Sequence, residues 1–119
     1  MRCESNRGQG VSGSLGVRVF IAFVKRALSE KRYRFTNRRK TLDYLTELGW
    51  TISDAVDLIF DLTPDDYHEG PLDERDPNFS SGVIYVFKRK VDDITTYIKL
   101  KMVDGEPPLV ILSFHEDEI

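Results

Sequence analysis

Six residues of this 119-residue chain combine a suitable type with a suitable position to act on a phosphodiester: two histidines, one tyrosine and three lysines. His68 and His115 are its only histidines, and imidazole exchanges protons near neutral pH, as a general base or general acid must. Tyr97 lies where polar and apolar residues alternate, and its phenol could stack on a base or donate a hydrogen bond. Three lysines in the same alternating segments could hold phosphate groups, namely Lys88, Lys99 and Lys101.

The sequence does not indicate a cofactor. Two histidines make no convincing metal site, and the acids of residues 61–76 lack the Asp-x-Asp-x-Asp-Gly spacing of a calcium loop. We also find no Gly-rich phosphate loop, no serine-nucleophile motif and no Cys/His pair. Any catalysis would therefore be acid–base chemistry without a metal.

The first part of the chain has the composition of a tail followed by helices. Residues 1–16 are rich in Gly and Ser and lack periodicity, so we expect a flexible tail. Apolar residues recur every three or four positions over 17–31, which predicts an amphipathic helix. A second helix is expected over 42–48, with Thr41 as its N-cap and Gly49 ending it.

A third helix and a turn precede a change of pattern. We expect this helix over residues 54–62, with Ser53 as its N-cap. Thr63 and the following proline should begin one further helical turn, since proline suits the first helical position. The Pro- and Gly-containing residues 69–82 are expected to form a long surface loop.

The second half alternates with a period of two, which predicts strands over 83–91, 94–103 and 109–114. Asp92 and Asp93 would form a tight turn that pairs Val91 with Ile94. That register is favoured because a slip by one residue would bury the lysines. The face expected to point inward holds Val83, Tyr85, Phe87, Val91, Ile94, Ile98, Leu100 and Met102.

The third strand decides whether His115 can join Tyr97. Its stronger apolar set, Val110, Leu112 and Phe114, is expected to face inward. Ile111, Ser113 and His115 would then share the outer face with Tyr97 and Lys99. Helices followed by an antiparallel meander predict an α+β fold, with the N-terminal helices packed on one face of a small antiparallel sheet in one domain over 17–119.

Charge is distributed unevenly along the chain, although the formal net charge is only −3. Residues 25–40 hold eight of the seventeen basic residues, whereas acids gather in residues 61–76 and near the C-terminus. Cys3 is the only cysteine, and we find neither a secretion signal nor an apolar run long enough for a membrane helix. These features favour a cytoplasmic protein with no membrane partner.

Several segments together resemble the MqsR-type toxins of bacterial type II toxin–antitoxin systems. They are TLDYLTELGWTISDAVDLIFDLTPDDYHEGP, then TYIKLKMVDG, then VILSFHEDE, and the resemblance covers about residues 33–116. It implies a RelE-like fold and messenger RNA cleavage without a metal. It also implies that an antitoxin protein neutralises the chain, with the acidic residues 61–76 and the basic residues 25–40 as candidate contact surfaces.

The resemblance also assigns roles to individual residues. It places Tyr97 at the family's catalytic tyrosine, His68 and His115 at basic catalytic positions, and Lys99 at a supporting phosphate contact. The best-studied members carry lysines where this chain has the two histidines, and a glutamine where it has Val86. We therefore expect His68, Tyr97 and His115 to be catalytic and Lys88, Lys99 and Lys101 to bind phosphate.

Other interpretations stay open on the sequence alone. The outer sheet face could be an ordinary solvated surface, because lysines alternating along strands are only weakly specific for a ligand. The same face could bind RNA or a protein without cleaving anything. A toxin fold that has taken on a structural or regulatory role is a further alternative.

Overall fold

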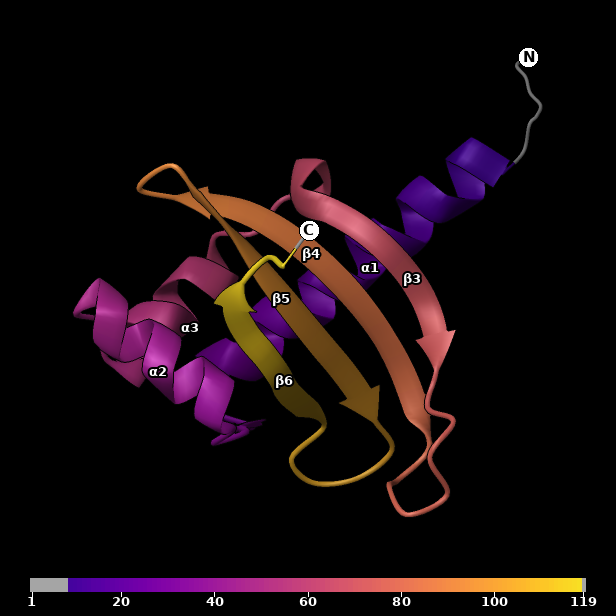
Figure 1. Ribbon diagram of the computed structural model, residues 1–119. Coiled ribbons are helices and arrows are strands. Elements are labelled where there is room, and N and C mark those ends of the chain that lie inside the picture. Colours follow the sequence, from indigo (N-terminus) through magenta and orange to yellow (C-terminus); the bar gives the residue numbers. More distant parts are fainter. Residues whose placement is uncertain (1–8, 119) are drawn as a thin grey trace.

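The computed structural model describes the backbone of residues 9–118 and the side chains of residues 16–118. It is an α+β fold in which the helices lie behind a curved sheet (Figure 1). The five strands have the order β2-β6-β5-β4-β3, and because β2 and β6 run parallel the sheet is mixed, not purely antiparallel as predicted. The elements are α1 Gln9–Ser29, β2 Tyr33–Phe35, α2 Arg39–Leu48, α3 Ile52–Phe60, the 3-10 turn η1 Pro64–Asp66, β3 Tyr67–Asp73, β4 Gly82–Val91, β5 Ile94–Val103 and β6 Leu109–Glu116.

The hydrophobic core lies between the helices and the inner face of the sheet. Phe87, Ile98 and Leu100 are fully buried there, and the remaining members of the predicted inner face are buried or partly buried. From the helices, Phe20, Val24, Leu45 and Ile59 among others complete the core. No helix in the described part of the chain is long and apolar enough to cross a bilayer.

The β4–β5 hairpin confirms the predicted register. Val91 pairs with Ile94, and the pairing continues without interruption to Gly82 opposite Val103. Asp92 and Asp93 both have positive φ, of 51° and 69°, as a two-residue turn that matches the twist of the strands requires. Because the register is regular, the outward side chains of β4 and β5 are where the alternation predicts them.

The helix boundaries differ from the predicted ones in three places. Helix α1 begins at Gln9 rather than at residue 17, so part of the predicted tail is helical, while residues 1–8 lie outside the described range. Gly16 lets α1 pass close to β4, because a Cβ there would lie 3.1 Å from the Tyr85 hydroxyl. The other two differences concern the caps of α2 and α3.

The predicted N-caps Thr41 and Ser53 were both wrong. Thr41 lies inside α2, where its buried hydroxyl accepts a hydrogen bond from the Phe114 amide at 3.3 Å. The α3 cap is Thr51, because Asp54 three residues later completes a reciprocal capping box with it. Gly49 and Thr63 do end α2 and cap η1 as predicted.

Two short strands lie where the sequence predicted none, β2 between the first two helices and β3 across the start of the predicted loop of residues 69–82. Strand β2 pairs with β6, and β3 pairs with β4 as an edge strand, so that only residues 74–81 remain a loop. Pro71 is tolerated in β3 because an edge strand needs hydrogen bonds on one side only. At Gly70, with φ of 127°, a Cβ would lie 2.8 Å from the Ile84 carbonyl oxygen, so the close β3–β4 approach requires glycine there.

Strand β6 contains an irregularity that overturns part of the predicted facing. Lys99 pairs with Ser113 but Leu100 pairs with Ile111, which leaves Leu112 as the extra residue of a β-bulge. Leu109, Ile111 and Phe114 are therefore the core residues of this strand. The predicted inward orientation of Val110 and Leu112 and the predicted outward orientation of Ile111 were wrong, and the inward orientation of Phe114 is confirmed. Beyond the bulge, the predicted phase returns.

Candidate functional site

The outer face of the sheet carries a hollow of about 410 Å³ that extends from β6 across β5 and β4 to the start of β3. Its lining includes five of the six predicted site residues, namely His68, Lys88, Tyr97, Lys99 and His115. The side chains come from four different strands, namely β3, β4, β5 and β6. The structure thus brings the two histidines and the tyrosine to one place, while their catalytic roles stay predictions.

Tyr97 and His115 form a cross-strand pair at the centre of this hollow. They are opposite each other in the β5–β6 register, and their rings stack at 5.1 Å between centroids with 13° between planes. His115 Nδ1 lies 2.9 Å from the backbone oxygen of Glu116. Because a carbonyl oxygen can only accept, Nδ1 must donate, and the neutral ring then has its lone pair on Nε2. His115 is therefore prepared to accept a proton at Nε2.

The surroundings of Tyr97 keep its phenol protonated. Partial burial is the main cause that raises the pKa of Tyr97, the Glu69 carboxylate raises it further, and the smaller effects of Lys88 and Asp117 oppose each other. A phenol whose pKa lies above its ordinary value near 10 carries its proton at neutral pH. Tyr97 can consequently donate a hydrogen bond to an anionic substrate, whereas it is poorly suited to remove a proton.

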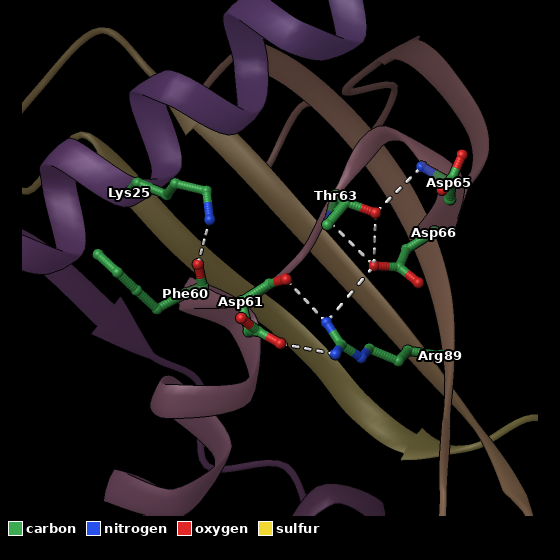
Figure 2. A network of polar contacts seen from close by, with 7 residues as sticks. All are labelled: Lys25, Phe60, Asp61, Thr63, Asp65, Asp66 and Arg89. Carbon is green, nitrogen blue, oxygen red and sulfur yellow. Dashed lines mark hydrogen bonds and ion pairs between the residues drawn. The ribbon is translucent and has the colours of Figure 1, made fainter.

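A polar network places the chain segment that leads to His68. Arg89, at the inner face of β4, donates to the Asp61 backbone oxygen at 2.8 Å and to the Asp61 carboxylate at 2.6 Å (Figure 2). It also lies 3.6 Å from the Asp66 carboxylate, which in turn accepts from the Thr63 amide. One guanidinium thus joins the end of α3, the turn η1 and the sheet, and η1 leads directly into β3.

The first residues of β3 direct His68 to the outer face. Tyr67 packs toward the helices against Tyr85, with 6.3 Å between the ring centroids, and its hydroxyl donates to the Gly70 oxygen at 2.6 Å. The β3–β4 register shifts between Tyr67 and Glu69, so His68 sits at an irregularity. The residue after an inward tyrosine points to the other side of the sheet, and His68 accordingly lines the hollow.

Lys101 is the predicted phosphate ligand that the structure places elsewhere. It is only 4% exposed, and its Nζ donates to the Glu74 carboxylate and to the Ser80 oxygen, both at 2.6 Å. The lysine is therefore committed to the loop of residues 74–81, and the assignment to phosphate binding is corrected. Alternation indicated correctly that it faces outward, but not that a loop would fold over it.

Acidic residues at the C-terminal end were missed as part of the site. Asp117 pairs with Lys88 at 3.0 Å, both side chains being less than one-fifth exposed. The same hollow is lined by Glu118, which pairs with Lys40 of α2. The run of three acids directly after His115 was the available signal, since a segment following a site residue must lie beside it. These acids offset part of the positive charge that a phosphate would meet.

Replacing Asp117 with asparagine is expected to strengthen binding of single-stranded RNA, because Lys88 would lose its competing carboxylate. Each additional lysine contact to a single strand steepens the dependence of log K on log salt by about 0.7. We therefore expect tighter binding at low salt and a steeper salt slope, measured by fluorescence anisotropy. Asp57→Asn, which removes the same charge from an exposed position on α3 away from both the hollow and its strands, is the control, and equal slopes for both variants would contradict the prediction.

Comparison with known proteins does not assign the chain to a family. No protein-family model matches the sequence, and no curated protein matches it. Among residues 9–118, no group of three or more His, Cys, Asp or Glu side chains is arranged to hold a metal ion.

Proposed function

We propose that the protein is an endoribonuclease that cleaves RNA without a metal, and that it acts as the toxin of an MqsR-like toxin–antitoxin pair with a RelE-like fold. The observation that carries the proposal is the stacked Tyr97–His115 pair, in which His115 contacts the Glu116 oxygen through Nδ1, in one hollow with His68 and Lys99. The resemblance over residues 33–116 assigns the same residues to catalysis.

The proposed reaction uses the substrate's own 2′-hydroxyl as nucleophile. His115 Nε2 takes the proton from O2′, which attacks the adjacent phosphorus and forms a 2′,3′-cyclic phosphate. The bond from phosphorus to O5′ breaks, and His68 as an imidazolium gives its proton to the departing O5′. Lys99 and the Tyr97 hydroxyl stabilise the additional negative charge on the phosphate oxygens. The proposed reaction requires neither an oxidant nor a metal, because the proton taken from O2′ and the proton given to O5′ balance.

Non-catalytic RNA binding is the alternative that a specific observation favours. Asp117 and Glu118 line the same hollow, and carboxylates so close to a reacting phosphate oppose the build-up of negative charge. A binding module that needs only moderate affinity would tolerate these acids. The two functions differ in one measurable respect, which is whether the RNA is broken.

The decisive experiment incubates the purified protein with mixed-sequence, single-stranded RNA in excess chelator. We expect fragments that end in a 2′,3′-cyclic phosphate and begin with a 5′-hydroxyl. A DNA oligonucleotide of matching sequence should stay intact, because it lacks the 2′-hydroxyl nucleophile. His68→Ala should cleave more slowly by about 10²–10⁴-fold while remaining folded. Intact RNA with the wild-type protein would reject the enzyme and leave the binding module.

The toxin role has its own test in cells. Induced expression in bacteria should arrest growth and produce mapped transcript ends with the same cyclic phosphates. The neighbouring gene, if it encodes the proposed antitoxin, should restore growth. If the double variant of His68 and His115 also arrests growth, growth inhibition does not depend on the hollow.

A further inference from the structure

A second hollow adjoins the candidate site on the same face of the sheet. It has a volume of about 590 Å³, within the roughly 300–1,000 Å³ that is usual for small-ligand sites. Lys99 lines both hollows, so one side chain stands at their junction. The other lining residues that matter here are Arg34, Arg38, Phe79, Ile84 and Leu112.

The walls of this second hollow differ in character. Its floor is apolar, since Ile84 and the bulged Leu112 face it from the sheet. Phe79 stands at the side formed by the loop of residues 74–81, and 60% of its surface is exposed although it is aromatic. Arg34 of β2 and Arg38 before α2 come from the opposite edge. An apolar floor with cations beside it suits a flat base attached to a phosphate.

The loop that carries Phe79 is held against the sheet. Lys101 donates to Glu74 at one end of the loop and to the Ser80 oxygen near the other end. The Glu74 amide donates to the Gly82 oxygen at 3.2 Å, and a Cβ on Gly82 would lie 2.5 Å from the Met102 oxygen. Lys101, which is too buried to bind phosphate, thus has a structural role, because it holds the wall of the second hollow in place.

The charges around this hollow leave the cations available. Four acids also line it: Glu74 is paired with Lys101 and Glu106 with Arg32, whereas Asp76 and Asp104 have no ion-pair partner among residues 16–118. The three cations Arg34, Arg38 and Lys99 have no ion-pair partner among residues 16–118. Arg side chains present a planar fork that matches phosphate oxygens. Asp76 and Asp104 offset two of these three charges, and the three unpaired cations can contact the phosphates on either side of a bound base.

We propose that the second hollow binds the nucleotide adjacent to the cleaved phosphodiester and is the specificity subsite of the enzyme. The base lies on the floor of Ile84 and Leu112 with Phe79 stacked on it, and Arg34 and Arg38 contact its far phosphate. Lys99 contacts the phosphate between the two hollows. This inference rests on the proposed ribonuclease function for the identity of the first hollow, but its binding test does not require cleavage.

The test measures affinity for a fluorescent, random-sequence RNA oligonucleotide with fluorine in place of every 2′-hydroxyl, which can bind but cannot be cleaved. Base stacking on an aromatic ring contributes about 1–3 kcal/mol, so Phe79→Ala should weaken binding by about 5–150-fold. Arg34→Ala should lower the steepness of the salt dependence by about 0.7. The matched controls are Phe60→Ala, which removes a half-exposed ring on α3, and Arg39→Ala, which removes an exposed cation at the start of α2. Neither should change the affinity.

The outcomes separate the subsite from the enzyme. If Phe79→Ala and Arg34→Ala both leave the affinity unchanged while the wild-type protein cleaves ordinary RNA, only the subsite is overturned. The second hollow would then be a candidate site for a protein segment. Weakened binding in the variants of a protein that cleaves nothing supports the subsite and overturns the ribonuclease. A wild-type protein that does not bind the fluorinated RNA overturns the subsite, and intact ordinary RNA would then overturn the ribonuclease too.

Discussion

Replacing His115 with glutamine is expected to slow the cleavage of single-stranded RNA by about 10²–10⁴-fold. The glutamine amide is planar, so it can still lie against Tyr97, and its NH₂ group could replace the donor that His115 Nδ1 provides to the Glu116 oxygen. It has no atom that takes up a proton near neutral pH, however. The variant should therefore bind RNA as the wild type does and fail in the proton-transfer step.

The control for this variant lies on the same face of the sheet. Lys90→Gln changes an exposed residue opposite Thr95, beyond the lining of the hollow, and should leave the cleavage rate unchanged. Single-turnover rates at saturating protein separate chemistry from binding. Cleavage by His115→Gln at the wild-type rate would remove His115 from the mechanism, and a loss of affinity equal to the loss of rate would make it a binding residue.

The central hairpin shows what could be predicted from sequence. In β4 and β5 one face is mostly apolar and the other carries Lys88, Lys90, Lys99 and Lys101, and only one register keeps these lysines out of the core, so local pattern and global fold agree. The positions of Tyr97 and Lys99 followed from that register. By contrast, Val110, Ile111 and Leu112 are all apolar, and either phase of β6 would bury apolar side chains. Alternation alone could not reveal the bulge for this reason.

The elements that were missed depend on contacts that are distant in the sequence. Strand β2 has three residues and exists because β6 lies beside it, and β3 contains a proline that local preference excludes from strands. The α3 cap was different, because Thr51 followed by Asp54 is a capping-box pattern that the sequence contained. The second hollow could not be predicted, since its wall depends on a loop folding onto Lys101.

Two Phe→Ala substitutions should separate the fold from the proposed site. Phe114 has no exposed surface and packs against Tyr44 and Trp50, with ring centroids 6.1 and 6.3 Å away, so its replacement should cost about 3–5 kcal/mol. Phe79 is 60% exposed, so its replacement should change stability by less than about 0.5 kcal/mol. Urea unfolding followed by circular dichroism measures both.

The comparison matters because Phe114 and His115 are neighbours on opposite faces of β6. Burial of Phe114 beneath α2 sets the phase of the strand after the bulge, and that phase brings His115 opposite Tyr97. A domain typically has about 5–15 kcal/mol of stability, so losing Phe114 should loosen the hollow through the fold. Phe79→Ala should affect RNA binding in a protein as stable as the wild type. Equal destabilisation by the two substitutions would mean that the loop of residues 74–81 belongs to the core, and that its aromatic ring is not available to a base.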